Sequence, residues 1–169
     1  MDNLESVLQP IENAHGLPNA CYIDSDMHTK EADAIFKKGW AAIGFGCDVP
    51  KAGCVYPLDM MGIPLLMVRA KNDTVHVFEN VCRHRGMILV DEPAKLNGPI
   101  TCPYHAWSYD LEGHLKATPH VGGPQIHKDK TVICERLSLN RVRSFVWRDV
   151  VFVNLSSKAP SFDLVVQPL

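Results

Sequence analysis

Hydrophobic and polar residues alternate along much of the chain, with the two-residue period of a half-buried β-strand. In the segment TVHVFEN (74–80), Val75 and Val77 share one face, and His76 and Phe78 share the other. Comparable short apolar segments, separated by glycine and proline, lie at residues 40–45, 53–58, 63–70, 115–118, 144–149 and 150–155. This pattern predicts a mainly β, antiparallel fold.

A short helix is predicted ahead of the strands. Thr29 suits an N-cap position, and Lys37 and Lys38 precede Gly39, where the helix is expected to end. The two cations complement the negative end of the helix dipole. Residues 1–39 are therefore expected to form an N-terminal helical extension.

The composition is that of a globular protein. Of the 169 residues, 46% are apolar and 21% are charged, and the net charge of −2 favours neither nucleic acid nor an anionic membrane as a partner. The start, MDNLESVLQPIENAHG, lacks the layout of a signal peptide, and no apolar run is long enough to cross a bilayer. A cytoplasmic location is therefore expected.

Two short segments each combine a cysteine with a histidine. Cys82 and His84 form a C-x-H pair, and Cys102 and His105 form a C-x-x-H pair. Both pairs fall in loops between predicted strands, and a rigid sheet can bring such loops together at one point. Two thiols and two imidazoles at this spacing predict a metal site.

Two kinds of metal centre fit these four ligands. A structural zinc ion binds two cysteines and two histidines, although zinc modules usually pair C-x-x-C with H-x-x-H. Here each segment supplies one sulfur and one nitrogen. This alternation favours a two-iron cluster in which one iron binds both thiolates and the other binds both imidazoles. A zinc-binding module is the alternative.

The other cysteines lie apart from any histidine at ligand spacing. We expect them to be small, buried apolar residues, because nothing in the sequence indicates export and a disulfide framework. They are Cys21, Cys47, Cys54 and Cys134.

The two segments resemble a known protein family. A C-x-H pair, seventeen residues and a C-x-x-H pair form the Rieske [2Fe-2S] signature. The strings NVCRHRGM and CPYHAWSYDLEGHL are similar to the large subunits of Rieske non-haem iron oxygenases, the ring-hydroxylating and related monooxygenase family. The similarity extends from about Trp40 to VWRDVVFVNL, so a Rieske domain is expected over residues 40–155.

The resemblance implies the cofactor and its ligands. A Rieske [2Fe-2S] cluster would be bound in a cluster-binding subdomain at about residues 80–115, by Cys82, His84, Cys102 and His105. The imidazoles are expected at the protein surface and the thiolates on the shielded side.

Three positions near the ligands depart from other members of the family. Met87 and Tyr104 stand where Rieske proteins of respiratory complexes have disulfide-forming cysteines, which favours the soluble oxygenase or ferredoxin branch. Ala106 stands where the family usually has glycine. A positive φ at Ala106 would therefore be strained.

Several neighbouring residues are predicted to support the cluster. Arg83 and Arg85 either attract an acidic electron donor, or they cap carbonyls or pair with Asp91 and Glu92. Tyr104 and Trp107 are expected to shield the cluster from water, and Ser108 or Tyr109 to hydrogen-bond a sulfur. Met87 is expected to fill the core.

The resemblance implies one-electron transfer by an oxygenase component. Electrons would come from a reductase or ferredoxin and pass to a mononuclear Fe(II) in the catalytic domain of a neighbouring subunit in a homotrimer. We expect that domain to be absent from this sequence. Residues 156–169, with an apolar group from Phe162 to Val166, would lead into it or fold back on the sheet. Alternatives are a free-standing Rieske ferredoxin-type carrier and the zinc module.

Overall fold

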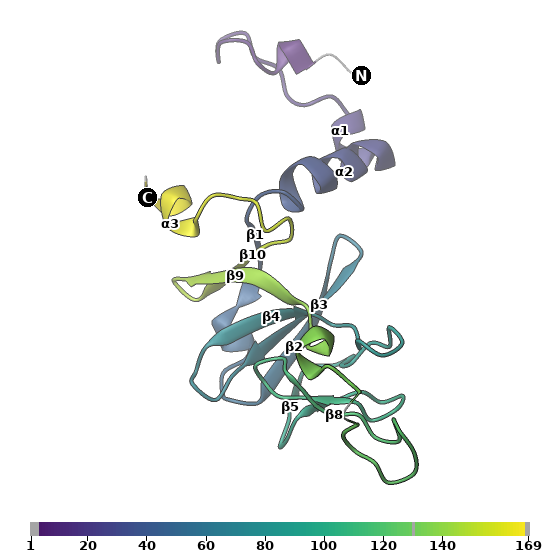
Figure 1. Cartoon of the computed structure of the whole chain (residues 1–169). Coiled ribbons are helices and arrows are strands. Elements are labelled where there is room, and N and C mark those ends of the chain that lie inside the picture. The colour runs from purple at the N-terminus through teal and green to yellow at the C-terminus, as the bar shows by residue number, and fades with distance from the viewer. Residues whose placement is uncertain (1–3, 130, 168–169) are drawn as a thin grey trace.

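The computed structural model describes residues 4–129 and 131–167 and confirms the mainly β, antiparallel fold (Figure 1). One sheet has seven strands in the order β1-β10-β9-β4-β3-β2-β5. Its strands are β1 (Ala41–Phe45), β2 (Cys54–Met60), β3 (Ile63–Arg69), β4 (Val75–Glu79), β5 (Ala94–Lys95), β9 (Arg141–Trp147) and β10 (Val150–Asn154). The second sheet has the order β6-β7-β8, with β6 (Ile100–Thr101), β7 (Ser108–Tyr109) and β8 (Leu115–Ala117).

Strands β3 and β4 separate two hydrophobic cores. Leu65 of β3 packs with Val77 of β4 in one core, together with residues of β1 and β10. Leu66 and Phe78 face the opposite way and pack in the second core, which includes both predicted cysteine ligands. The two-residue alternation seen in the sequence therefore divides these strands between two buried faces.

The β9–β10 hairpin starts and ends at residues other than those predicted. The sequence pattern placed strands at 144–149 and 150–155 with no turn between them. In the structure, Arg148 and Asp149 form the turn, with φ of 48° and 69°. Two successive positive φ values are typical of the tight turns that match the twist of a hairpin.

Residues 4–36 contain η1 (Leu4–Ser6), α1 (Ala20–Ile23), α2 (Ser25–Glu31) and a π-helical turn, η2 (Ala32–Phe36), and they project away from the sheet in Figure 1. The prediction that Thr29 caps the helix was wrong. The helix begins earlier, where the Asp24 carboxylate accepts from the Asp26 N–H at 2.8 Å. Thr29 lies inside α2, and its hydroxyl donates to the Ser25 carbonyl at 2.9 Å. No helix in the described part of the chain is long and apolar enough to cross a membrane.

The C-terminal segment folds back on the outer face of the β9–β10 hairpin, ending in α3 (Phe162–Val166). Phe162 is 3% exposed, and its ring centroid lies 4.8 Å from that of Phe145 and 4.6 Å from that of Phe152. Leu164 and Val165, in contrast, are exposed. Phe162 therefore anchors the apolar group on the sheet. The remaining elements are η3 (Gly46–Asp48) and η4 (Cys134–Leu137).

Candidate metal centre

The two ligand loops have the same backbone geometry. In the first loop, the Cys82 N–H donates to the Met87 carbonyl at 2.8 Å, and the Gly86 N–H donates to the Cys82 carbonyl at 3.0 Å. In the second loop, the Cys102 N–H donates to the Trp107 carbonyl at 2.8 Å, and the Ala106 N–H donates to the Cys102 carbonyl at 3.0 Å. Each cysteine is therefore fixed by bonds to residues four and five positions further on.

This equivalence explains the unusual backbone at Ala106. Gly86 and Ala106 occupy the same place in their loops, with φ of 72° and 56°. The left-handed conformation is natural for glycine and costly for alanine. The positive φ considered from the sequence is present at Ala106, and this loop carries the corresponding strain.

The four predicted ligands lie together at the junction of these loops. Cys82 and Cys102 are 2% and 3% exposed, whereas both imidazoles are half-buried and lie toward the surface. The ring centroids of His84 and His105 are 4.9 Å apart. This arrangement, with thiols inside and imidazoles outside, agrees with the expected orientation of the pairs.

His105 provides a direct test of whether these residues fit a metal. Its Nδ1 is buried and has no hydrogen-bond partner among the described residues. A buried polar atom left unpaired is costly, so an unpaired imidazole nitrogen is expected where a metal binds. The donor set of two thiols and two imidazoles therefore fits an iron–sulfur cluster.

The protonation of the pairs follows from their burial. Burial lowers the pKa of the His84 imidazole, and His105 and the nearby Arg85 guanidinium lower it further. His84 is therefore held in the neutral form that binds metals. Burial raises the pKa of the Cys82 thiol, so its thiolate needs a compensating positive charge, which a metal supplies.

Of the two residues considered as hydrogen-bond partners of a sulfur, Ser108 and Tyr109, it is Tyr109 that lies within reach. Its hydroxyl lies 3.4 Å from Cys82 Sγ and accepts from the Arg83 N–H at 3.1 Å. Burial raises the pKa of the Tyr109 phenol, so the hydroxyl keeps its proton. The buried Tyr109 thus connects the second loop to the first.

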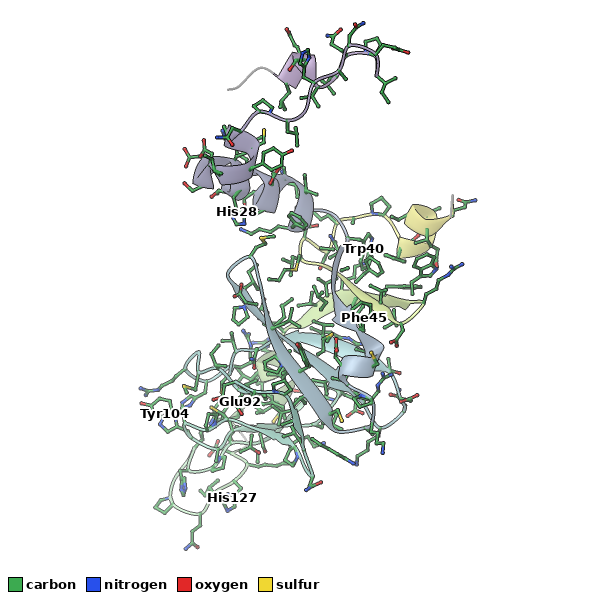
Figure 2. The ribbon with its side chains drawn as sticks, turned by 180° about the vertical axis from the view of Figure 1, so that it is seen from behind. His28, Trp40, Phe45, Glu92, Tyr104 and His127 are labelled. Carbon is green, nitrogen blue, oxygen red and sulfur yellow. The ribbon has the colours of Figure 1, made fainter. Side chains whose placement is uncertain are left out.

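Trp107 and Tyr104 each lie against one of the imidazoles, but they differ in exposure. Trp107 is buried and stacks on His84, with ring centroids 4.6 Å apart and planes 8° apart. Tyr104 is 59% exposed and lies at the edge of the molecule in Figure 2. It follows Pro103 in the surface turn of the loop, so its ring covers His105 from outside, at a centroid distance of 3.7 Å.

The charged neighbours of the first loop are solvent-exposed. Arg83 and Arg85 are both exposed. Within the part of the chain that the structure describes, no ion pair joins them to Asp91 or Glu92. The pairing with Asp91 and Glu92 is therefore not seen, and attraction of an acidic donor stays a prediction.

Two predictions about buried sulfur were wrong. Met87 is 43% exposed, because it lies in a run of exposed residues from 85 to 88. All six cysteines are free thiols, but of the four outside the site, Cys47 is exposed and the other three are half-buried. Cys47 lies in η3, where its backbone N–H bonds to the Asp149 carboxylate at 3.2 Å and its side chain is left outside the core.

A cavity of about 540 Å³ lies against the imidazoles, lined by His84, Tyr104, His105, Trp107, Pro119 and His120 among others. His120 had drawn no functional prediction from the sequence. Across the described ranges, 4–129 and 131–167, no group of three or more His, Cys, Asp or Glu side chains is arranged to hold one metal ion. The two imidazoles lie side by side and the two thiols share the core, the arrangement expected for a cluster in which one iron binds both thiolates and the other binds both imidazoles.

The family model of the Rieske [2Fe-2S] domain matches residues 39–141. The chain belongs to the Rieske [2Fe-2S] domain family. This family binds a Rieske cluster, in agreement with the donor set described above.

The Rieske domain is similar to parts of several oxygenase subunits. It is 33% identical over 114 residues to the glycine betaine monooxygenase oxygenase subunit of Chromohalobacter salexigens, covering 68% of this chain and 26% of that one. The corresponding subunit of Pseudomonas aeruginosa is 30% identical over 158 residues, which cover 93% of this chain and 35% of that one. Biphenyl 2,3-dioxygenase subunit alpha of Rhodococcus jostii is 31% identical over 84% of this chain and 30% of that one. The chain thus spans about a third of these relatives.

Solved structures agree with the fold of the Rieske domain. A quaternary ammonium Rieske monooxygenase is 27% identical, with a TM-score of 0.76, and the match covers 89% of this chain and 41% of that one. Naphthalene 1,2-dioxygenase from Rhodococcus sp. has the same fold, with a TM-score of 0.76 at 24% identity over 87% of this chain and 33% of that one.

Proposed function

We propose that Cys82, Cys102, His84 and His105 bind a Rieske [2Fe-2S] cluster and that this domain relays single electrons within an oxygenase large subunit. The observation that carries the proposal is the buried, unpaired Nδ1 of His105 beside His84, outside two buried thiols in equivalent loops. When bound, such a cluster supplies one-electron redox chemistry at potentials of about −150 to +300 mV.

The residues of the chain have separate tasks in this proposal. The two cysteines bind from the core side, where the loop hydrogen bonds fix them. The imidazoles form the outer edge, where an electron-transfer partner can approach within a short distance. Trp107 keeps water from one face of His84 and holds its ring plane by stacking.

The proposed partners follow from the oxygenase relatives. A reductase or ferredoxin would deliver electrons, with exposed Arg83 and Arg85 attracting an acidic surface. The electrons would pass to the mononuclear iron of a catalytic domain, in a neighbouring subunit of a homotrimer. We infer a cytoplasmic location. We also infer an N-terminal extension at 1–39 and a Rieske domain at 40–155, with its cluster-binding subdomain at about 80–115. Residues 156–169 would lead toward the catalytic domain.

Metal content and absorption test the ligand assignment. Anaerobically purified protein is expected to hold two iron and two sulfide ions, as the cluster formula requires, and to be red-brown. Cys102→Ala and His105→Ala are expected to remove iron and colour, whereas Cys134→Ala and His28→Ala keep both, because neither residue lies in the site. One zinc without iron would support the structural module and contradict the proposal.

A further inference from the structure

The Tyr109 hydroxyl can hydrogen-bond Cys82 Sγ only if the backbone around Tyr109 holds it in place. Its hydroxyl oxygen accepts from the Arg83 N–H at 3.1 Å, so the hydroxyl proton is free to point at Cys82 Sγ, 3.4 Å away. The strand that carries it, β7, has two residues, and its register against β8 shifts between Ser108 and Tyr109. The core packs around the Tyr109 ring, which is fully buried, but a strand this short and irregular leaves the backbone position of Tyr109 dependent on the residues that follow it.

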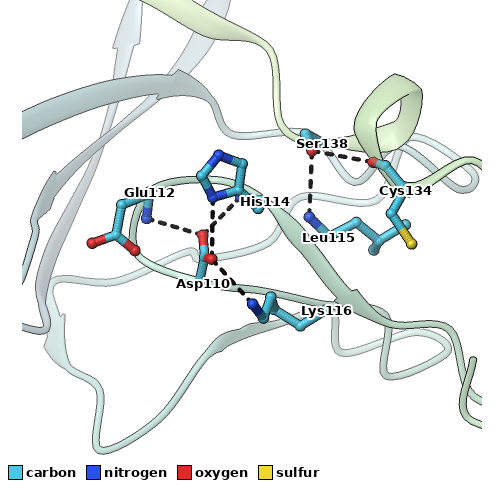
Figure 3. A network of polar contacts seen from close by, with 7 residues as sticks. All are labelled: Asp110, Glu112, His114, Leu115, Lys116, Cys134 and Ser138. Carbon is cyan, nitrogen blue, oxygen red and sulfur yellow. Dashed lines mark hydrogen bonds and ion pairs between the residues drawn. The ribbon is translucent and has the colours of Figure 1, made fainter.

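The residue after Tyr109 provides the missing restraint. As Figure 3 shows, Asp110 lies at the centre of a polar network. Its Oδ1 accepts from the backbone N–H groups of Glu112 at 3.2 Å and His114 at 2.8 Å. Its Oδ2 lies 3.2 Å from His114 Nδ1 and 3.6 Å from Lys116 Nζ. One carboxylate therefore closes the whole turn from 110 to 114.

The turn is also locked against the core beneath it. Gly113 has a φ of 88°, and a Cβ there would lie 2.5 Å from Cε1 of Phe78. The Leu139 N–H donates to the Gly113 carbonyl at 2.8 Å. Phe78 belongs to β4, the strand that leads into the first ligand loop. The packing of Gly113 on Phe78 therefore fixes the 110–114 turn relative to that loop. Closing the turn thus sets where Tyr109 stands relative to Cys82.

A second turn with the same sequence pattern lacks the close packing of glycine on the core that is found at Gly113. Asp59 and Gly62 form the other D-x-x-G segment of the chain, between β2 and β3. The Gly62 N–H donates to Asp59 Oδ1 at 2.9 Å, and φ of Gly62 is 80°. A Cβ at Gly62, however, would meet nothing within 4 Å. The Asp59 turn is therefore free at the surface, and it serves as a matched control.

We propose that Asp110 is a positioning residue for the metal centre: its carboxylate fixes the 110–114 turn and so holds the Tyr109 hydroxyl on Cys82 Sγ. The proposal rests on the proposed function, because it concerns the redox potential of the bound cluster. Within the described part of the chain, Asp110 forms no hydrogen bond with Cys82 or another proposed ligand, so it acts through Tyr109.

The direction of the potential shift separates positioning from a simple charge effect. A hydrogen bond to a cysteine sulfur stabilises the more negative, reduced state and raises the potential. Losing the Tyr109 contact therefore lowers the potential. Removing a nearby carboxylate charge without moving Tyr109 does the opposite, because the reduced state then suffers less repulsion. The two explanations of an Asp110 effect thus differ in sign.

The experiment is a redox titration of the cluster-loaded chain followed by visible absorption. The single variants are Asp110→Ala, Asp110→Asn and Tyr109→Phe. A double variant combines Asp110→Ala with Tyr109→Phe, and Asp59→Ala is the control. We expect Asp110→Ala to lower the midpoint potential in the direction of Tyr109→Phe, and the double variant to show no further lowering. Asp110→Asn keeps the Oδ1 acceptor and is expected at or above the wild-type potential, and Asp59→Ala is expected to match wild type.

Other outcomes would overturn the proposal. A potential at or above wild type in Asp110→Ala, shifts that add fully in the double variant, or an unshifted Tyr109→Phe would each do so. If Asp110→Ala cannot hold the cluster, Asp110→Glu replaces it, since it keeps the charge but displaces the acceptor; a lowered potential supports positioning and an unchanged one opposes it. A wild-type chain that binds no iron–sulfur cluster would instead refute the proposed function.

Discussion

In the seven-stranded sheet, β2 and β3 pair over six residues, from Val55↔Val68 to Met60↔Ile63. In the three-stranded sheet, β6 and β7 pair over two, Ile100↔Tyr109 and Thr101↔Ser108. Independent stability needs three or more strands with a hydrophobic face, and strands of two residues are shorter than the usual three to ten. The smaller sheet depends on loop hydrogen bonds, on the Asp110 turn and on the proposed metal. The comparison indicates a rigid platform that carries a subdomain stabilised by its cofactor.

Removing the metal is expected to have the largest effect, and to destabilise the smaller sheet and the ligand loops far more than the seven-stranded sheet. Ligand loops that meet at a metal lose their common anchor on chelation, because binding free energy contributes to folding free energy. Hydrogen exchange of amides at residues 80–115 is expected to accelerate at least about 100-fold, while β2–β4 amides change little. Exchange measured on cluster-loaded and chelated protein checks this. Uniform acceleration of both sheets would contradict the separation.

Truncation of the two neighbouring leucines of β3 tests the division of the cores. Leu65 and Leu66 are both fully buried but pack in different cores. Each Leu→Ala change is expected to cost about 3 kcal/mol in the free energy of unfolding, measured in urea. Leu66→Ala is also expected to speed loss of the cluster, because Cys82 and Cys102 belong to its core. Equal loss from Leu65→Ala would argue against two separate cores.

A buried histidine in the seven-stranded sheet is expected to make the free energy of unfolding depend on pH. His76 is 5% exposed, and Arg141 Nη2 lies 2.6 Å from its Nδ1, which must accept because guanidinium only donates. Burial, and then the Arg141 charge, lowers the pKa of His76 in the folded state. The unfolded state therefore binds a proton that the folded state excludes, from about pH 6.5 down to the lowered folded pKa.

Stability is consequently expected to be greatest above about pH 6.5 and to fall as the pH decreases, by at most about 1.4 kcal/mol per pH unit for this one proton. Urea unfolding between pH 7.5 and 5.5 measures the slope. His76→Gln is expected to flatten it, since the amide does not titrate, whereas His28→Gln on the exposed α2 keeps it. An unchanged slope in His76→Gln would show that other groups carry the effect.

The smallest expected effect comes from the strained second ligand loop. Ala106 has a φ of 56°, so Ala106→Gly is expected to stabilise the protein by about 0.5 kcal/mol. The matched change in a regular strand, Ala117→Gly in β8, is expected to destabilise it by about 0.5–1 kcal/mol. The two denaturation midpoints should therefore shift in opposite directions. Shifts of the same sign would show that φ at Ala106 is not a source of strain.

The sequence predicted those features that depend on local pattern. Alternation in 74–80 placed β4, and the spacing of cysteine and histidine placed the ligand loops. The possible positive φ at Ala106 was considered because the family has glycine there.

Other features depend on contacts that no local pattern records. The exposure of Tyr104 follows from the outward direction of the loop, and the Asp24 cap follows from where the helix starts in space. The equivalence of the two loops becomes visible only in their hydrogen bonds, although both carry a small residue four positions after the cysteine.

The most direct test of the account is electron–nuclear double resonance on the dithionite-reduced protein, prepared with and without ¹⁵N-labelled histidine. The account predicts a rhombic iron–sulfur signal with two nitrogen couplings that both change on labelling, from His84 and His105. Substituting His28 is expected to leave both couplings in place. An iron–sulfur signal without histidine nitrogen couplings, or a protein that holds one zinc ion and no iron, would contradict it.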